Sequence, residues 1–199
     1  MSEDFRYKRT EKHIREAFLH LLRTKKYEKI TVNDIAEHAE ISRNAFYSHY
    51  YSKEELLYSL MDVMINKCNE NQDRILDEKG YFDAEVARSM LVSCIEPLYE
   101  DEELCKLFFR VGGGEVFSQR LAKALADFQF SKSNKTSLTS RQRRDLRLYC
   151  DYRASGVVGV IRSSFLSDEP YAKDDLVELL YTIGTGGGNQ MLDPVEHNK

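Results

Sequence analysis

The sequence predicts an all-α fold of about nine helices, with an N-terminal domain over residues 1–53 and a C-terminal helical domain over residues 54–199. Apolar residues recur at the i, i+3, i+4, i+7 spacing of a buried helix face, whereas the alternation typical of strands is scarce. Helix-start signatures and glycine stops separate these stretches. The charge divides at the same place, because residues 1–53 carry a formal +3 and the remainder −7.

The composition is typical of a globular protein in water. The chain has 199 residues, of which 31% are charged and 42% hydrophobic, and its mean hydropathy is −0.54. No segment approaches the roughly 20 apolar residues of a membrane span, and the N-terminus lacks the apolar core of a signal peptide. We therefore expect a cytoplasmic protein with no membrane partner. Cys68, Cys94, Cys105 and Cys150 lack metal-ligand or disulfide spacing, so we expect them to be buried and expect no metal or cofactor.

The N-terminal elements follow from an apolar stripe and from capping residues. A first helix is expected from about Lys8 to Lys25. Thr31 can cap a second helix, and Asp34 follows three residues later, where its charge suits the helix N-terminus. Ser42 can cap a third helix that ends near Tyr50, and Ser52-Lys-Glu-Glu55 forms a capping box for a fourth helix, which ends near Asp77. The stripe of the first helix comprises Ile14, Ala17, Phe18, Leu21 and Leu22.

The C-terminal helices are bounded by proline, glycine and a polar stretch. Pro97 is expected to stop the fifth helix, Gly112-Gly113-Gly114 to end the sixth, and residues 131–140 to form a loop before the eighth. The five expected helices cover about Asp83 to Pro97, 101–111, 115–130, Arg141 to Leu166, and Lys173 to Ile183.

The segment from Thr31 to Leu57 carries the most functional information. Two short helices joined by a tight turn, with a longer helix on either side, have the geometry of a helix-turn-helix. Such a unit places its second helix in the major groove of DNA. Ala45 and Phe46 would anchor that helix from inside, and the outward residues would be Arg43, Asn44, Tyr47, Ser48 and His49.

The same segment resembles the TetR family of bacterial transcriptional regulators. The features that match are Thr31, Asp34-Ile35-Ala36, Ile41-Ser42, Phe46-Tyr47-x-His49-Tyr50 and Ser52-Lys53-Glu54-Glu55-Leu56-Leu57. The resemblance implies a nucleoid-associated repressor that binds a palindromic operator as a homodimer and is released by a small, largely apolar effector. Two residues depart from the family pattern. Glu40 occupies a turn position where glycine is usual, at a cost of about 1 kcal/mol for a left-handed backbone, and Tyr51 stands where a basic residue is frequent.

Chemistry and the resemblance together assign the DNA contacts. Arg43 can donate two hydrogen bonds to a guanine, Asn44 can pair with adenine, and Ala45 can touch a thymine methyl. The predicted base contacts are Asn33, Arg43, Asn44 and Ala45, and the predicted phosphate contacts are Thr31, Tyr47, Ser48, His49 and Lys53. Packing at the rim of the domain remains the alternative for Tyr47 and His49, and plain solvation is the alternative for Arg43.

The resemblance makes the C-terminal domain the site of effector binding and dimerisation. The predicted dimer interface lies on the last two helices and comprises Tyr149, Gly156, Val157, Val160, Ile161, Leu176, Leu179, Leu180 and Ile183. The predicted effector pocket is lined by Tyr58, Met61, Met64, Cys68, Met90, Cys94, Tyr99, Leu104, Phe108 and Phe117. An ordinary apolar core is the alternative for both sets.

Two other functions were weighed against an effector-controlled repressor. Enzyme activity is disfavoured, because both glycine triplets follow helices and neither precedes the Lys-Ser/Thr pair of a phosphate-binding loop. The histidines show neither metal-ligand nor catalytic spacing. A DNA-bound adaptor or activator that acts without a ligand stays open.

Overall fold

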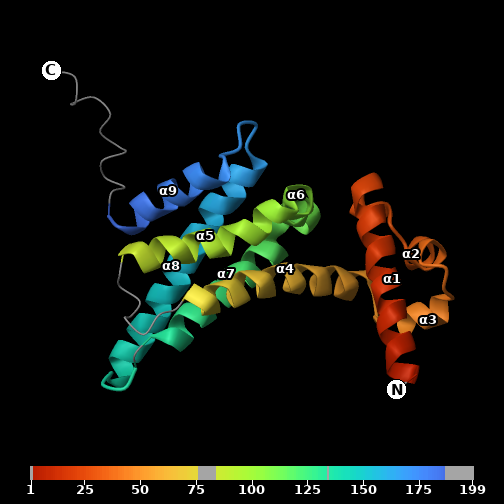
Figure 1. Cartoon of the computed structure of the whole chain (residues 1–199), viewed down its shortest axis with the longest axis horizontal. Coiled ribbons are helices and arrows are strands. Elements are labelled where there is room, and N and C mark those ends of the chain that lie inside the picture. The colour runs from red at the N-terminus through yellow and green to blue at the C-terminus, as the bar shows by residue number, and fades with distance from the viewer. Residues whose placement is uncertain (1, 76–83, 134, 187–199) are drawn as a thin grey trace. The chain divides into compact units, whose positions relative to one another are not determined.

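The computed structural model describes residues 2–75, 84–133 and 135–186, and the regular structure in these ranges is entirely helical (Figure 1). This confirms the predicted all-α fold. Two short 3-10 helices, η1 and η2, lie among the α-helices. The elements are α1 (Ser2–Thr24), η1 (Tyr27–Lys29), α2 (Val32–His38), α3 (Arg43–Tyr47), α4 (Lys53–Ile75), α5 (Ala84–Glu100), α6 (Glu102–Arg110), η2 (Val111–Gly114), α7 (Glu115–Lys132), α8 (Ser140–Leu166) and α9 (Lys173–Gly184).

The chain forms two compact units that divide within α4. Residues up to Val63 belong to the first unit and residues from Met64 onward to the second. The sequence analysis placed a domain boundary ten residues earlier, at the start of this helix. The first turns of α4 contribute Leu56, Leu57 and Leu60 to the buried residues of the first unit. Helix α4 is therefore shared by the two units along the chain.

The core of the first unit is built on the predicted stripe of α1. Ile14 and Phe18 are completely buried, as are Ile35 of α2 and Phe46 of α3. Helix α1 packs against α2, and α2 packs against α3. Burying a side chain of this size contributes roughly 1.5–3 kcal/mol, so these four residues fix the short α2 and α3 in place. Helices this short would be marginal by themselves.

The turn between α2 and α3 uses a left-handed residue that is not glycine. Glu40 has φ 55°, the positive φ that the family pattern predicts at this position. The amide of Ile41 donates to the Ala36 carbonyl (3.0 Å), and the amide of Glu40 donates to the Glu37 carbonyl (3.1 Å). These are the two bonds of a Schellman motif, which ends a helix through one left-handed residue. The helix-turn-helix connection therefore keeps its usual geometry despite the glutamate.

Helix α3 is shorter than the sequence predicted, because it ends at Tyr47 and not near Tyr50. The amides of His49 and Tyr50 both donate to the Phe46 carbonyl, at 2.9 and 3.0 Å, which tightens the last turn. The Tyr50 hydroxyl donates to Glu11 of α1 (3.1 Å) and accepts from Arg15 (3.0 Å). These bonds hold Tyr50 to α1 and draw the chain away from the helix axis.

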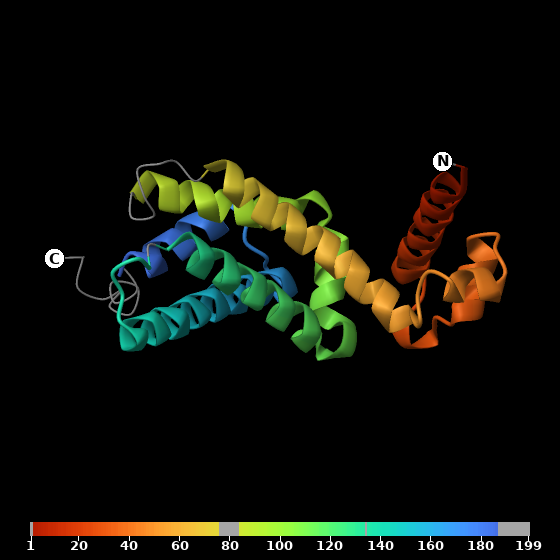
Figure 2. The same cartoon turned by 90° about the horizontal axis from the view of Figure 1, so that it is seen from below.

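The second unit is held by two long helix pairs and a cluster of aromatic rings. Helix α7 packs along α8, and α5 packs against α9 (Figures 1 and 2). Phe117 lies 5.2 Å from Phe108 and 4.9 Å from Phe109 between ring centroids. Phe165 of α8 joins the cluster, 6.1 Å from Phe109. All four rings are buried, so α6, α7 and α8 share one core.

Helix α5 continues through Pro97 to Glu100, which corrects the prediction that it stops at the proline. A proline inside a helix removes one backbone hydrogen bond and costs about 3 kcal/mol. Ile95 and Leu98, on either side of it, are completely buried. Their packing outweighs that cost and keeps the last turn helical.

Two further expectations concern the cysteines and membrane spans. Cys68, Cys94, Cys105 and Cys150 are all free and buried, as predicted. Desolvation raises the pKa of the Cys105 thiol, and a hydrogen bond with Cys94 together with burial raises that of Cys68. Within the described ranges, no helix combines the length and the apolar character that a bilayer crossing requires.

Candidate nucleic-acid interface

The outward face of α3 presents the polar side chains that the sequence analysis assigned to DNA bases. Arg43 and Asn44 are exposed and Ala45 is half-buried. Phe46 of the same helix is completely buried in the core. The Ser42 hydroxyl accepts from the Ala45 amide (3.1 Å) and caps the helix, as predicted. The helix is therefore anchored on one side and free on the other, which is the arrangement that reading of base edges requires.

Arg43 and Tyr47 are coupled to each other in the protein without DNA. The Arg43 guanidinium donates to the Tyr47 hydroxyl (3.2 Å) and lies 5.5 Å from the centroid of the Tyr47 ring. The Tyr47 ring in turn meets Phe46 edge-on at 5.6 Å. The sequence analysis treated the two residues as independent contacts. Because the Tyr47 side chain contacts the Arg43 guanidinium through both its hydroxyl and its ring, Tyr47 also helps to determine where that guanidinium lies.

His49 stacks on a residue that the sequence analysis did not assign to the site. The ring of Tyr7, on α1, lies 4.0 Å from the His49 ring at an interplanar angle of 27°. Burial lowers the pKa of the His49 imidazole, and its Nδ1 is buried without a hydrogen-bond partner in the described part of the chain. Burial thus favours the neutral form of the imidazole, which can still form a hydrogen bond with a phosphate oxygen.

The Lys53 ammonium, which is predicted to contact a phosphate, is directed at the protein backbone. It donates to the carbonyl oxygens of Tyr27 (3.0 Å) and Ile30 (2.8 Å) and lies 4.3 Å from the centroid of the Tyr27 ring. Two of its three N–H bonds are thus used to tie the start of α4 to the segment before α2. Lys53 acts on the fold first, and only the remaining N–H bond is available to a phosphate.

The hydroxyls of Thr31 and Ser48 are also engaged within the protein. The Thr31 hydroxyl accepts from the Asp34 amide (3.1 Å) and donates to the Asp34 carboxylate (2.8 Å). The Thr31 backbone amide also donates to this carboxylate (2.7 Å), and this completes a capping box. Hydrogen bonds from the Thr31 backbone and from Lys25 lower the pKa of Asp34 to about 2. The Ser48 hydroxyl donates to the Ala45 carbonyl (2.7 Å). By contrast, the side chain of Asn33 is exposed on α2.

Tyr7 and Arg15 are the site residues that sequence reasoning missed. Tyr7 lies one residue before the expected start of the first helix, so its place on the helix face was not considered. Counted from Ile14, however, Tyr7 lies two turns earlier on the same face, and Arg15 lies next to that face. Extending the periodicity by one turn would have placed Tyr7 on the helix face, whereas Arg15 already lay inside the predicted helix and its bond with Tyr50 depends on packing.

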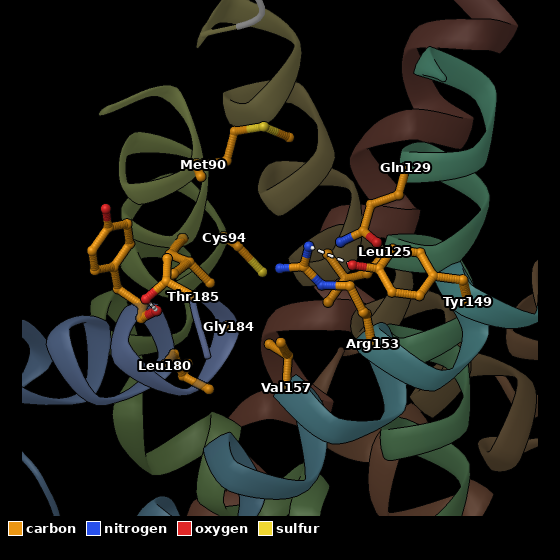
Figure 3. Close-up of a pocket in the computed structure, with 13 residues that line it drawn as sticks. Met90, Cys94, Leu125, Gln129, Tyr149, Arg153, Val157, Leu180, Gly184 and Thr185 are labelled. Carbon is orange, nitrogen blue, oxygen red and sulfur yellow. Dashed lines mark hydrogen bonds between the residues drawn. The ribbon is translucent and has the colours of Figure 1, made fainter. Parts of the chain in front are cut away.

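A separate cavity of about 330 Å³ lies inside the second unit, among α5, α7, α8 and α9 (Figure 3). Of the predicted effector residues, Met90 and Cys94 line it. The others do not line this cavity, namely Tyr58, Met61, Met64, Cys68, Tyr99, Leu104, Phe108 and Phe117.

The positions of five of these other residues explain why they do not line the cavity. Tyr58 and Met61 belong to the first unit. Cys68, Phe108 and Phe117 are completely buried, since their apolar side chains serve the core. Helical spacing thus identified buried residues without distinguishing core from the wall of this cavity, and an effector role for the other residues stays a prediction.

The residues predicted for a dimer interface separate into four groups. Ile161, Leu176 and Leu180 are buried within the single chain, which corrects their assignment to an interface. Tyr149 and Val157 line the cavity, together with Leu180. A groove between α8 and α9 is lined by the remaining candidates Gly156, Val160 and Leu179. Ile183, near the end of α9, is exposed.

Comparison with known proteins agrees with this geometry. The family described as "Bacterial regulatory proteins, tetR family" matches residues 14–60, which include α2, α3 and the start of α4. The HTH-type transcriptional regulator EthR of Mycolicibacterium smegmatis is 42% identical over 57 residues, covering 29% of this chain and 26% of EthR. The dhaKLM operon transcriptional activator DhaS of Lactococcus lactis is 33% identical over 73 residues, covering 37% of this chain and 36% of DhaS.

The fold of the whole chain also has a counterpart among solved structures. A putative TetR-family transcriptional regulator from Syntrophomonas wolfei superposes with a TM-score of 0.70 at 14% identity, and the match covers 96% of this chain and 99% of that one. The chain spans about a quarter to a third of the length of the two curated relatives, so their resemblance concerns the helix-turn-helix region. The matched segment, residues 14–60, is thus similar in sequence to the tetR family of bacterial regulatory proteins, and the left-handed turn and the all-helical second unit agree with that similarity.

Proposed function

We propose that the chain is a DNA-binding transcriptional regulator that places α3 in the major groove of a palindromic operator as a homodimer. The observation that carries this proposal is the exposed Arg43–Tyr47 pair on a helix anchored by the buried Phe46. A guanidinium and an amide on one exposed helix face are the groups that read guanine and adenine edges. Arg43 and Asn44 are those groups here, and Asn33 lies exposed on the preceding helix.

Binding would require Arg43 to exchange one partner for another. In the free protein its guanidinium donates to the Tyr47 hydroxyl. In a complex the guanidinium would turn to a base, and the freed hydroxyl of Tyr47 would donate to a phosphate oxygen. One conformational step thus supplies both a specific contact and a positioning contact. Ser48, His49 and Thr31 would add weaker phosphate contacts, because their polar groups are already partly engaged or buried.

A homodimer is proposed because a single helix-turn-helix reads only half of a palindrome. The groove between α8 and α9 supports this proposal, since Gly156 and Gly159 place no side chain on its α8 wall at two positions, where a partner helix can approach closely. The proposed effector site is the cavity of the second unit. An effector would act by binding more tightly to the conformation that spaces two copies of α3 wrongly for DNA. A tenfold loss of operator affinity needs about 1.4 kcal/mol of such coupling.

The test begins with selection of the bound sequence from random duplexes. The purified protein is expected to select a palindrome, and an asymmetric site would contradict the homodimer. Fluorescence anisotropy on single-base-pair variants of that site then compares the wild type with Arg43→Ala. The variant is expected to lose about 1–3 kcal/mol of discrimination at one base pair per half-site. Arg144→Ala, which removes an exposed arginine from α8, is the control and is expected to bind like the wild type.

The alternative is a ligand-independent activator or adaptor of the same fold. The similarity to DhaS favours keeping it, because that protein is described as a transcriptional activator. In vitro transcription from a template carrying the selected site distinguishes the two. Repression that a small molecule relieves supports the effector-controlled repressor, whereas stimulation without any ligand supports the alternative.

A further inference from the structure

The wall of the cavity in the second unit combines apolar and polar side chains with one charged group among the described residues. Met90, Leu125, Val157 and Leu180 face it from α5, α7, α8 and α9, and Figure 3 shows their side chains around the central space. Met90, Leu125 and Leu180 are buried. Among the residues that line the cavity, the charged one is Arg153 of α8. A ligand here would therefore meet an extended apolar surface and a single cation.

The Arg153 guanidinium is held at the edge of the cavity without an acidic partner. Its Nη1 lies 3.5 Å from the Tyr149 hydroxyl, at the limit of a hydrogen bond, and its carbon lies 5.8 Å from the Tyr149 ring centroid. The guanidinium also lies next to Gly184 of α9, since the Arg153 Nη2 atom is 3.4 Å from the position that a Cβ would take there. Within residues 2–75, 84–133 and 135–186, the ion pairs that form do not include Arg153.

Arg147 of the same helix differs from Arg153, because it has acidic partners among the described residues. Arg147 forms ion pairs with Asp127 and Asp151, at 2.5 and 2.9 Å, and these raise its pKa. Arg153 lies six residues further along, half-buried, and has only a tyrosine as its partner. A half-buried guanidinium is costly to desolvate unless a hydrogen-bonded anion compensates it. Arg153 is therefore the place in the cavity wall where an anionic group of a ligand would meet a positive charge.

We propose that the cavity binds a monocarboxylic acid with an apolar tail, and that its carboxylate pairs with Arg153. A guanidinium binds a carboxylate through two parallel hydrogen bonds, and one positive charge balances one negative charge. The Tyr149 hydroxyl and the Gln129 amide lie near the Arg153 guanidinium in the cavity wall and can complete the polar contacts (Figure 3). A phosphate dianion would carry twice the charge that this wall can neutralise. The volume, near the lower end of the range for ligand pockets, suits a small acid.

This inference rests on the proposed function in one respect, because that proposal makes the cavity the effector site. Ligand binding is therefore measured first without DNA. Isothermal titration calorimetry on the full chain compares hexanoate, octanoate and phenylbutyrate with the alcohols of the same carbon skeletons. At least one acid is expected to bind more tightly than its alcohol by about tenfold or more, the effect of a charge-assisted hydrogen bond. Equal affinity for acids and alcohols, or no binding by any of the three acids, would overturn the inference.

The variant Arg153→Met assigns the effect to this guanidinium. It is expected to bind the acid about tenfold or more weakly while binding the alcohol as before, because the apolar wall is unchanged. Arg144→Met, on the same helix but away from the cavity, is the matched control and should leave both affinities unchanged. If Arg153→Met does not fold by circular dichroism, Arg153→Gln takes its place. An acid that binds Arg153→Met as tightly as the wild type would contradict the assignment.

The DNA measurement separates this inference from the proposed function. Anisotropy on the selected operator is repeated with saturating acid. An acid that binds through Arg153 without changing operator affinity supports the carboxylate site and contradicts effector control. Operator binding that is intact in a protein with no preference for acids contradicts the carboxylate site and leaves the DNA-binding proposal standing.

Discussion

Replacing Glu40 by glycine is expected to stabilise the first unit. Glu40 has φ 55°, and it is exposed at the junction of α2 and α3. An L-residue with a side chain pays roughly 1–2 kcal/mol to adopt the left-handed conformation, whereas glycine adopts it freely. The variant Glu40→Gly therefore removes a local strain while keeping the two backbone hydrogen bonds of the Schellman motif.

The net gain is smaller than the strain, because glycine also loosens the unfolded chain. That entropic term works against the variant by about 0.4–1 kcal/mol. The difference leaves an expected stabilisation of about 0.5–1 kcal/mol. Urea denaturation followed by circular dichroism measures it as a higher midpoint at an unchanged slope. Hydrogen exchange of the amides in α2 and α3 assigns the gain to the first unit.

The control is Glu37→Gly, which removes the same charge three residues earlier. Glu37 is exposed in the regular part of α2, where glycine costs about 0.5–1 kcal/mol relative to a good helix former. The two substitutions are chemically identical and should have opposite signs. If Glu40→Gly lowers the midpoint as much as Glu37→Gly does, the turn does not depend on a left-handed residue and the reasoning fails.

Three further outcomes follow from particular contacts. Gly114→Ala should lower the free energy of unfolding by well over 2 kcal/mol, because a Cβ there overlaps the Phe109 carbonyl. Gly112→Ala, also at positive φ but with open space around it, should lower it by only about 1–2 kcal/mol. Equal losses in urea denaturation would show that the overlap is relieved. Lys53→Met should destabilise the first unit by about 1–3 kcal/mol, because two carbonyls lose a charged donor; unchanged stability with weakened DNA binding would return Lys53 to a phosphate role. The folded-state pKa of Asp34 is near 2, below its ordinary value of 3.8, so its contribution to stability is present above that value and is lost as the pH falls toward 2. Asp34→Asn should flatten the stability profile over that interval, and a profile as steep as that of the wild type would mean that other carboxylates set it.

The helix-turn-helix could be predicted from the sequence because its determinants are local. Thr31 and Asp34 form the expected capping box, and Ser42 caps α3 as expected. Each of these bonds joins residues three positions apart, so the order of residue types contains the information. The departure at Glu40 could be interpreted as well, since a family position that favours glycine implies a positive φ whatever residue occupies it.

The contacts between distant residues could not be predicted in this way. The Lys53 ammonium donates to carbonyls 23 and 26 residues earlier in the chain, and the ring of Tyr7, on α1, stacks on the ring of His49. A lysine and a histidine near a recognition helix are typical of phosphate contacts, and nothing in their local pattern indicates that the protein itself uses them. Such pairings depend on how helices pack, which periodicity does not specify.

The sequence predicts one apolar stripe on α8, whereas in the structure the apolar residues of this helix lie on three different sides. Its fully buried residues are spaced at three or four positions and form the core side, while two other sides face the cavity and the groove. The core side comprises Cys150, Ala154, Val158, Ile161 and Phe165. Tyr149, Arg153 and Val157 follow one another at intervals of four on the cavity side, and Gly156 and Val160 lie on the groove side. Because consecutive residues are about 100° apart around a helix, Val157 and Gly156 share neither neighbours nor role. A long helix that is apolar on several sides therefore predicts burial but not the partner of each side. Substitutions at Arg153 can accordingly test the cavity while leaving the groove, and any dimer it forms, intact.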